Sequence, residues 1–437
     1  MRSLAPPPIF GGLLPSAGGC IVALVFLLLA DHAAQTRRAG FVFATSEAAT
    51  RWPGFRGDGT NVSHAARLPL TWSDQTVAWR VTTPGFGQSS PVIWDSSVFV
   101  TSIEGAMKER LWVTALNLED GSEQWRQAFD ASEPHEFNDY VSKAAPTPVV
   151  DQDRVYSFFA SGDLIALGHD GAVHWQRDLT KDYGSVGGNH GVGNSLLLTP
   201  RAVVVLLTRR TYSYLLAVDR TTGDTLWRTE RDAGVAWTTP VLSPEGNEIV
   251  VSASGQIEGF DAVTGERRWH FAGLSGNHVP SPTVTNELVV VGGLAVDANL
   301  AIRRGGLGKL DETAVAWKTG SGSNFGSPFA YGKCIYWINP AGAARCLDPQ
   351  SGEVQWTHRL SASTWATPLG HRDHVFFFGE DGTTEILAAS AKTAQVVATN
   401  HLSVSAPVTA IAAVDDAILI RAGTELIRVS SDDKALN

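Results

Sequence analysis

The chain has 437 residues, with 34 Lys and Arg against 44 Asp and Glu, a formal net charge of −10 and only 18% charged residues. This acidic balance excludes a nucleic-acid scaffold, because such a scaffold needs clustered basic side chains to displace counterions from phosphates. An apolar content of 43% excludes a disordered chain. The 43 glycines and 14 tryptophans are typical of many short strands joined by tight turns.

Residues 1–48 are predicted to lie outside the fold. Ile21 to Ala30 is a run of ten apolar residues, which as a helix spans roughly 15 Å, about half of a hydrocarbon core. This length favours the core of a signal peptide. An uncleaved membrane anchor is the alternative, because Leu13 and Leu14 extend the run. We therefore expect an exported protein of the periplasm or cell envelope, either secreted or attached to the membrane through this segment.

The rest of the chain is repetitive, and a fixed period decides the architecture. A tryptophan recurs in a similar context every 39 to 52 residues, starting at Trp79. Six of these tryptophans are expected to be buried between repeats, namely Trp125, Trp175, Trp227, Trp269, Trp317 and Trp356. A second marker is a proline after a small or hydroxyl residue, found at Pro91, Pro148, Pro240, Pro282, Pro328, Pro368 and Pro407. The apolar runs between the markers are predicted to be strands.

One repeat shows why the unit is a sheet. The apolar run from Ser213 ends at Asp219, Gly223 supplies a turn with positive φ, and the next strand carries Trp227. About 40 to 50 residues suit four short strands with their turns, which is the size of one propeller blade. Because a single blade cannot bury both of its faces, the blades must stack around an axis.

The two ends of the repetitive region complete one another. The last repeat, residues 406–430, ends before a tryptophan strand, whereas residues 77–81 form a tryptophan strand with no repeat before it. The sequence therefore predicts an all-β fold, an eight-bladed β-propeller of four-stranded antiparallel blades. Its last blade is closed by the N-terminal strand near Trp79. The propeller spans residues 49–430, and residues 431–437 form a tail.

A family resemblance follows from these motifs. The pattern of Ala217, Asp219, Thr222, Gly223 and Trp227 resembles the tryptophan-docking motif of eight-bladed quinoprotein propellers. The opening residues 52–59, WPGFRGDG, and residues 68–72, LPLTW, look like the start of bacterial PQQ-binding-like β-propeller repeat proteins. That group shares its fold with BamB-type outer-membrane assembly subunits and with quinoprotein alcohol dehydrogenases. The resemblance implies the fold, but its members range from enzymes to scaffolds.

The dehydrogenase branch of this resemblance implies a quinone cofactor, PQQ, beside a calcium ion held by Glu, Asn and Asp, with a disulfide between adjacent cysteines. This chain has no adjacent cysteines, and no such calcium set is evident from spacing. The glycine-rich Gly305 to Leu310 lacks two residues of a phosphate loop, and His371 to His374 is expected to be a solvated turn. We predict no catalytic residue, no metal and no cofactor. The alternative is an oxidoreductase with PQQ and calcium.

Polar and aromatic residues precede several predicted innermost strands, and these segments converge on one mouth of the channel in a propeller. The candidate ligand-binding residues are Lys143, Asn189, His190, Trp237, Asn277, His278 and Trp365. Aromatic, amide and imidazole groups around a concavity are typical of a small-ligand or peptide site. Alternatively, the Asn and Gly residues only make turns and the aromatic residues plug the channel. We expect a monomeric, non-catalytic binding or scaffolding module for a protein partner or a small ligand.

Cys334 and Cys346 flank the predicted turn at Asn339 to Gly342, which places them on opposite strands of a hairpin. Export permits a disulfide between them. Two buried free thiols are the alternative, because cross-strand disulfide geometry is often strained.

Overall fold

The computed structural model describes residues 50–134, 144–186, 191–209, 212–232, 234–276, 278–320 and 325–431. The predicted signal or anchor segment, residues 1–48, lies outside these ranges. Within them, no helix has the length and apolar character needed to cross a membrane.

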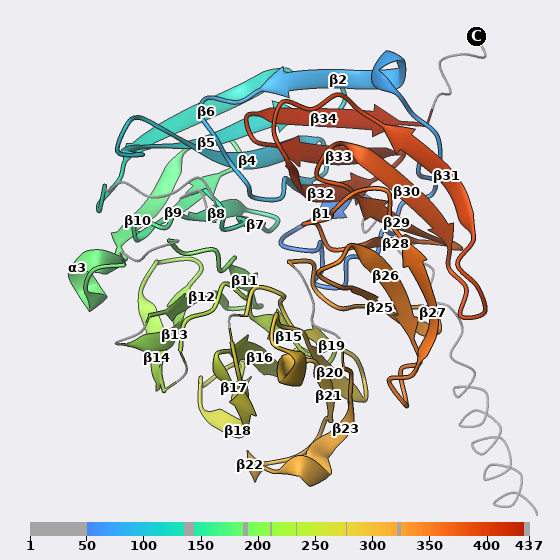
Figure 1. Cartoon of the computed structure of the whole chain (residues 1–437). Coiled ribbons are helices and arrows are strands. Elements are labelled where there is room, and N and C mark those ends of the chain that lie inside the picture. Colours follow the sequence, from blue (N-terminus) through green and yellow to red (C-terminus); the bar gives the residue numbers. More distant parts are fainter. Residues whose placement is uncertain are drawn as a thin grey trace, which may run out of the picture. The chain divides into compact units, whose positions relative to one another are not determined.

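The described residues form eight sheets around a common axis (Figure 1), which confirms the predicted eight-bladed propeller. Blade 1 contains β1 (Arg51–Trp52), β3 (Val92–Trp94), β4 (Ser97–Glu104), β5 (Arg110–Asn117) and β6 (Glu123–Asp130). Blade 2 contains β7 (Val149–Val150), β8 (Arg154–Phe158), β9 (Asp163–Gly168) and β10 (Val173–Asp178). Blade 3 contains β11 (Leu197–Leu198), β12 (Ala202–Thr208), β13 (Ser213–Asp219) and β14 (Thr225–Arg231). Blade 4 contains β15 (Val241–Leu242), β16 (Glu248–Ala253), β17 (Gly255–Asp261), β18 (Arg267–Leu274) and β22 (Gly308–Leu310).

The second half of the ring repeats this plan. Blade 5 contains β19 (Thr283–Val284), β20 (Leu288–Val291), β21 (Leu300–Arg303) and β23 (Val315–Lys318). Blade 6 contains β24 (Phe329–Tyr331), β25 (Cys334–Ile338), β26 (Ala343–Leu347) and β27 (Val354–Arg359). Blade 7 contains β28 (Leu369–His371), β29 (His374–Phe378), β30 (Thr383–Ala388) and β31 (Val396–His401). Blade 8 contains β32 (Val408–Val414), β33 (Ala417–Ala422), β34 (Glu425–Ser430) and β2 (Val77–Thr82). The short helical segments are α3 (Leu179–Tyr183), η1 (Asp74–Thr76), η2 (Val296–Ala298) and η3 (Glu312–Ala314).

Blade 8 is assembled from both ends of the described chain. Strand β2 pairs antiparallel with β34, with Val81 opposite Leu426. This confirms the predicted closure by the strand that carries Trp79. Because the N-terminal strand completes the last sheet, the ring needs no exposed sheet edge between its first and last blades.

Two blades carry a fifth strand that the repeat does not predict. Strand β1 pairs with β3 on the inner side of blade 1, and β22 pairs in parallel with β18 on the outer side of blade 4. The chain between β21 and β23 belongs to blade 5, so β22 reaches back to the neighbouring blade. The glycine-rich Gly305–Leu310 therefore leads into an edge strand rather than the start of a helix.

Hydrophobic clusters join each blade to the next. One cluster brings Tyr156 and Phe158 of blade 2 together with Val203, Val205 and Leu207 of blade 3, and all five side chains are buried. In contrast, the outermost strands are more exposed, as in β14, where exposed and partly buried residues precede the buried Arg231. Most of the apolar area is therefore buried between blades, which means that no blade is stable without its neighbours.

The recurring tryptophans join neighbouring blades by a hydrogen bond. The indole Nε1 of Trp125 donates to the carbonyl oxygen of His169 in the next blade at 2.6 Å, and that of Trp175 donates to Arg220 at 3.2 Å. The same bond is made by Trp79 to Leu118, Trp317 to Pro349 and Trp356 to Ser390. The accepting turns hold a glycine with positive φ beneath several of the rings, as Gly223 does beneath Trp175.

Trp269 departs from this pattern. Its Nε1 donates to Glu248 Oε1 of its own blade at 2.7 Å. In blade 5 the connection from β21 to β23 contains β22 and η3 in place of the short Asp-to-Gly turn. The usual carbonyl acceptor of the neighbouring turn is therefore replaced by a buried carboxylate.

The junction between blades 7 and 8 also departs from the repeat. Ala398 occupies the position of the docking tryptophan, because it lies opposite Ile386 as Trp356 lies opposite Cys346. In blade 8 the equivalent turn would lie between β34 and β2. These two strands come from distant parts of the sequence, so the chain does not run from one into the other. Trp72 is instead buried in the hydrophobic cluster against which Ala398 packs. Its backbone N–H donates to Asn400 Oδ1 at 2.8 Å.

Two glycines of blade 4 have similar positive φ angles, but only one of them lies against a tryptophan ring. Gly265 has φ +72°, and a Cβ there would lie 2.3 Å from Trp227 Cε3, whereas Gly246 has φ +74° and nothing within 4 Å. We expect Gly246→Ala to cost about 1 kcal/mol through backbone strain. Gly265→Ala should cost a further ~1–3 kcal/mol because Trp227 must move. Urea unfolding of both variants measures the difference, and equal losses would contradict the docking role of Trp227.

Candidate functional site

A belt of hydroxyl groups surrounds the axis of the propeller. The backbone N–H of the belt residue in each of blades 1–6 donates to the hydroxyl oxygen of the belt residue in the next blade, over 2.9 to 3.2 Å. In order around the ring, the belt residues are Ser90, Thr147, Ser195, Thr239, Ser281, Ser327 and Thr367. In blade 8 the equivalent residue is Ala410. It lies four residues before the end of β32, as Thr367 lies four residues before the end of β28. The belt thus explains the recurring hydroxyl residue before proline.

A second tier of side chains lies alongside the belt. Side chains two residues apart in extended chain point to the same side, so the residue two positions before each belt hydroxyl also faces the axis. This upper tier consists of Gln88, Ala145, Gly193, Trp237, Val279, Phe325 and Trp365, with Thr409 in blade 8 beside a β-bulge. The two tiers together line a cavity of about 440 Å³. Its upper wall is aromatic at blades 4, 6 and 7 and small at blades 2 and 3.

The floor of this cavity is made by a segment that precedes the first full blade. We call residues 52–63 the plug segment. Asn61 Nδ2 donates to the carbonyl oxygens of Thr367 and Pro368, and Val150 N–H of blade 2 donates to the carbonyl oxygen of Pro53. The plug segment therefore bonds to blades on different sides of the ring. Its residues Phe55, Arg56 and Asn61 line the cavity.

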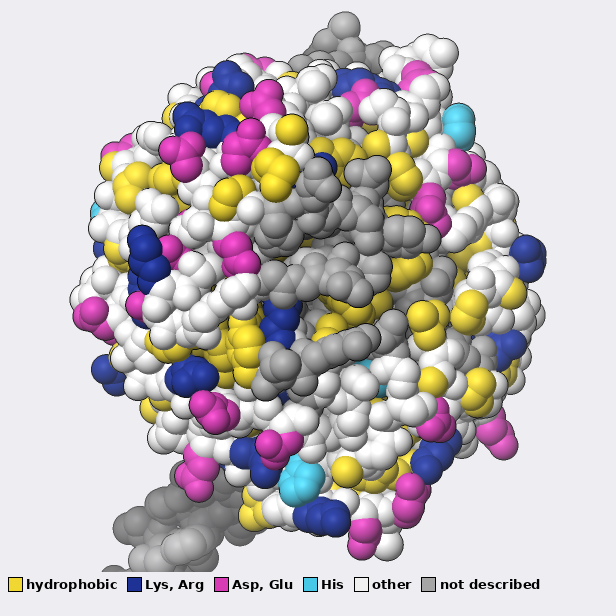
Figure 2. All heavy atoms as spheres, turned by 60° about the vertical axis from the view of Figure 1, so that its left-hand side comes forward, with side chains coloured by type: hydrophobic (Ala, Val, Ile, Leu, Met, Phe, Trp, Pro, Cys, Tyr) yellow, Lys and Arg dark blue, Asp and Glu magenta, His cyan; other side chains and the backbone are white. Residues whose placement is uncertain are grey.

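Arg56 brings a buried charge to the cavity. Its side chain donates to the carbonyl oxygen of Pro282 at 2.9 Å and to Thr283 Oγ1 at 3.2 Å, and the residue is 4% exposed. Burial lowers the pKa of Arg56 to about 10, against the opposing effect of the nearby Asp58 charge, so the guanidinium stays protonated at neutral pH. The described lining residues include no Asp or Glu. On the face shown in Figure 2, by contrast, acidic and basic side chains are interspersed.

The structure places three of the predicted ligand-binding residues. Trp237 and Trp365 line the cavity, and the Trp365 ring lies 5.1 Å from the ring of Phe325. His278 is fully buried behind the wall, where burial lowers its pKa, and its carbonyl oxygen accepts the N–H of Trp237 at 2.9 Å. Its main chain therefore positions Trp237, while its imidazole does not line the cavity. Lys143, Asn189, His190 and Asn277 lie outside the described residues.

Sequence reasoning missed the hydroxyl belt and the plug segment. The signal for the belt was present, because each marker proline follows a belt residue in blades 1, 2 and 4 to 7. In blade 8 the marker does not identify the belt position. Pro407 lies just before β32, whereas the belt position is Ala410. Nothing in the spacing of Arg56 or Asn61 predicted that they reach the axis.

The segment His371–His374 corrects another expectation. The turn residues Arg372 and Asp373 are exposed, as predicted, but the flanking His371 is only 3% exposed. It ends the innermost strand β28, where the burial of its ring lowers the pKa to about 4. In the described part of the chain, no group of three or more His, Cys, Asp or Glu side chains is arranged to hold a metal ion.

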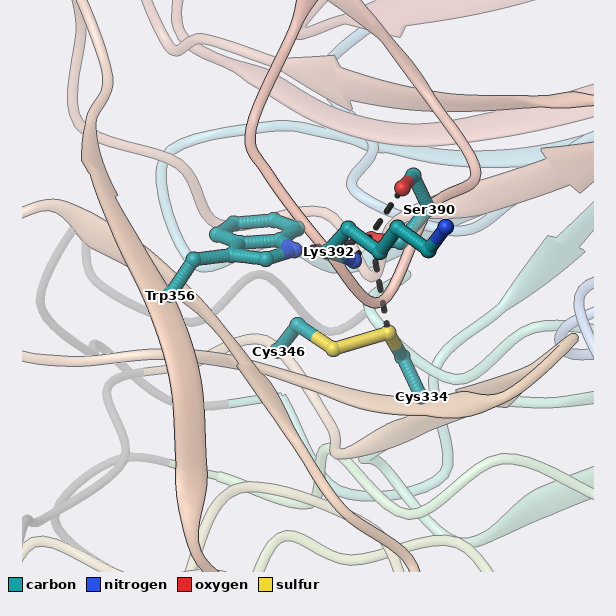
Figure 3. Close-up of a disulfide and its surroundings, with 5 residues drawn as sticks. All are labelled: Cys334, Cys346, Trp356, Ser390 and Lys392. Atoms are coloured by element: carbon teal, nitrogen blue, oxygen red, sulfur yellow. Dashed lines mark hydrogen bonds between the residues drawn. A yellow bond between two sulfur atoms is a disulfide. The ribbon is translucent and has the colours of Figure 1, made fainter.

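Cys334 and Cys346 are joined in a disulfide with an S–S distance of 2.04 Å (Figure 3). Both residues are buried, and Cys346 lies opposite Trp356 on the neighbouring strand. The indole of Trp356 donates to the carbonyl oxygen of Ser390 in blade 7 at 2.7 Å, and Cys334 Sγ lies 3.8 Å from the same oxygen. The disulfide is therefore part of the contact between blades 6 and 7.

These features define a closed eight-bladed propeller of the tryptophan-docking type, with an axial cavity floored by its own chain. Residues 61–205, 211–303 and 303–433 match the family described as outer membrane protein assembly factor BamB, and the chain belongs to this family. The outer membrane protein assembly factor BamB of Alkalilimnicola ehrlichii is 27% identical over 157 residues, which is 36% of each chain. This chain thus aligns with about a third of the length of that relative.

Solved structures with the same architecture include the following two. BamB from Moraxella catarrhalis superposes with a TM-score of 0.59 at 15% identity, over 82% of this chain and 98% of that one. The quinohemoprotein alcohol dehydrogenase from Comamonas testosteroni superposes with a TM-score of 0.62 at 13% identity, over 92% and 84%. At these identities the likeness shows the fold alone.

The buried imidazole of His371 predicts a dependence of stability on pH. The unfolded chain takes up a proton near the ordinary pKa of 6.5, whereas folded His371 resists protonation down to about pH 4. Its neutral form therefore contributes fully above about pH 6.5, and stability falls as the pH drops from there towards 4. Between neutral pH and about pH 5, we expect His371 to account for a loss of about 2 kcal/mol.

Urea unfolding at the two pH values measures this loss. His371→Gln should reduce the pH dependence, while His174→Gln on the exposed outer strand β10 controls for the loss of a surface imidazole. An unchanged pH dependence in His371→Gln would contradict the assignment.

Proposed function

We propose that this protein is an exported, non-catalytic binding propeller of the cell envelope, which holds a ligand or a segment of a partner protein in its axial cavity. The observation that carries the proposal is the cavity with two tiers and a floor. Its volume of about 440 Å³ lies in the usual range of ligand sites, roughly 300–1,000 Å³. Its wall combines apolar and aromatic side chains with a few polar groups at fixed positions, which is the usual composition of such sites.

The belt is suited to orient a ligand. In blades 2 to 7, the hydroxyl oxygen of the belt residue accepts a backbone N–H from the preceding blade. A Ser or Thr hydroxyl that accepts in this way still has its own proton to donate. A polar group of a bound molecule can therefore be held without moving the backbone of the ring.

The lining chemistry favours binding over catalysis. A Ser or Thr nucleophile needs an adjacent general base, and the described lining residues include no His, Lys, Asp or Glu. Arg56 stays protonated at neutral pH and cannot serve as that base. None of the described lining residues therefore activates the hydroxyls of the belt.

Location and partner type are inferred from three features. The N-terminal apolar run indicates export, and the disulfide of Cys334 and Cys346 is typical of an oxidising compartment such as the periplasm. The matching family and the relative from Alkalilimnicola ehrlichii are described as outer membrane assembly factors, which supports a protein partner in the envelope.

A quinone-dependent oxidoreductase is the second candidate, because a quinohemoprotein alcohol dehydrogenase shares the fold. The aromatic tier suits a planar molecule. Calcium, however, takes about six to eight oxygen ligands, with carboxylates among them, and the described lining residues provide no carboxylate. The described residues therefore do not fit the calcium of that cofactor pair.

Removal of the aromatic wall tests the binding role. We expect immobilised wild-type protein to retain a specific component from a cell-envelope extract, and Trp237→Ala/Trp365→Ala to lose it with the fold intact by circular dichroism. Trp112→Ala is the control, because Trp112 lies on β5 of blade 1, away from the cavity. Mass spectrometry of both protein and small-molecule eluates identifies what is retained.

Equal retention by the double variant would contradict the cavity as the binding site. A second measurement addresses the quinone candidate. Adding PQQ with Ca²⁺ should produce no dye-linked alcohol oxidation, and Ca²⁺ should not change the melting temperature beyond any shift that PQQ causes alone. A large thermal shift together with dye reduction would favour the oxidoreductase instead.

A further inference from the structure

Arg56 is a buried cation that forms no ion pair with an acidic side chain among the described residues, although the charge of Asp58 acts on it from nearby. Asp58 is held elsewhere, by the backbone and hydroxyl of Thr60 and by His64 Nε2 at 3.4 Å. A buried charge with no paired counter-charge destabilises the folded state. The site is therefore expected to gain from an anion.

The donors of Arg56 are only partly used. A guanidinium has five N–H groups, and the contacts of Arg56 with described residues use one on each terminal nitrogen. Its Nε is buried and has no hydrogen-bond partner there. Arg56 lines the cavity at its floor. Its side chain therefore has unused N–H donors next to the space that a ligand would occupy.

The wall above Arg56 is suited to one flat apolar group. Trp237, Phe325 and Trp365 supply aromatic side chains in the upper tier, while Ala145 contributes only a methyl group. The Trp237 ring packs closely against Gly193, where a Cβ would lie 3.1 Å from Trp237 Cδ1. A cavity of about 440 Å³ lies near the low end of the range for ligand sites, which favours a molecule of one or two rings.

The single cation favours a carboxylate over a phosphate. The planar guanidinium matches the two oxygens of a carboxylate. A phosphate monoester carries nearly two negative charges at neutral pH, and Arg56 is the one charged side chain among the described lining residues.

We propose that the axial cavity binds an aromatic carboxylic acid, with the carboxylate on Arg56 and the ring against the aromatic upper tier. This inference rests on the proposed role of the cavity as the binding site. Two sources share the chemistry, namely a free aromatic acid and the C-terminal aromatic residue of a partner chain.

The first test compares an acid with its amide on the wild-type protein. Indole-3-acetate should raise the melting temperature and bind in calorimetry, whereas indole-3-acetamide, which has the same ring and no charge, should bind about tenfold or more weakly. Benzoate with benzamide repeats the comparison on a smaller ring. Equal affinity of acid and amide, or no binding of either acid at millimolar concentration, would overturn the proposal.

The second test removes the cation. Arg56→Met should lose the acid preference while keeping or raising the melting temperature of the unliganded protein, because it removes an unpaired buried charge. Arg421→Met is the matched control. Arg421 is also fully buried, burial lowers its pKa to about 10, and it lies in blade 8 outside the cavity lining. Acid binding that survives in Arg56→Met would overturn the proposal, and the acid–amide comparison decides if this variant does not fold.

The remaining arms separate the sources and the two proposals. The third probe is a short peptide that ends in tryptophan with a free carboxylate, and its C-terminal amide is the control. If the natural ligand is the end of a partner chain, this peptide should bind more tightly than indole-3-acetate. If the natural ligand is a free acid, the peptide should bind more weakly. If neither acid nor peptide binds but Trp237→Ala/Trp365→Ala still loses its retained component, this inference fails and the proposed function stands. If retention is also unchanged, both fail.

Discussion

The contact between the outer-strand tryptophan of one blade and the turn of the next is the interaction on which this structure depends. A blade of four strands has two apolar faces, and only another blade can cover each of them. The indole fills the gap between two blades, and its N–H satisfies a turn carbonyl of the neighbour, as Trp125 does with His169. A glycine beneath the ring allows the close approach, as Gly171 does beneath Trp125. Repeated around the ring, this contact brings the innermost strands together at the axis.

Eight innermost strands that meet at one axis leave a channel, and the chain uses its irregular parts to close it. The belt joins blades 1 to 7 in succession through hydrogen bonds from a backbone N–H of one blade to a Ser or Thr hydroxyl of the next. The plug segment crosses the channel and bonds to blades 2, 5 and 7 through Pro53, Arg56 and Asn61. An open channel thereby becomes a cavity with a floor, in which side chains from distant parts of the sequence face the same small volume.

The repeats differ where they face the cavity, and these differences carry its chemistry. The same upper-tier position is tryptophan in blades 4 and 7, phenylalanine in blade 6 and glycine in blade 3. The fold is shared by an outer membrane assembly factor and by a quinohemoprotein alcohol dehydrogenase, so architecture alone does not decide between binding and catalysis. The cavity of this chain has a wall without described carboxylates and a single arginine, which the plug segment supplies.

The sequence by itself determined the number of blades, the closure near Trp79 and the packing of tryptophans between repeats, because a period of about 40–50 residues with one tryptophan each leaves few ways to cover both faces of a sheet. Of the six tryptophans expected to be buried, Trp269, Trp317 and Trp356 are, whereas Trp125, Trp175 and Trp227 are only partly buried. The sequence also pointed to Trp237 and Trp365, since both precede an innermost strand. It did not reveal that His371 is buried or that Arg56 and Asn61 reach the axis. It also did not reveal that Trp72 is buried at the junction where Ala398 stands in the docking position. Those placements depend on contacts between residues about 230 to 330 positions apart, such as Arg56 with Pro282 and Trp72 with Asn400. Local patterns determine the repeating unit, whereas only the closed ring decides which of its irregular side chains meet at the centre.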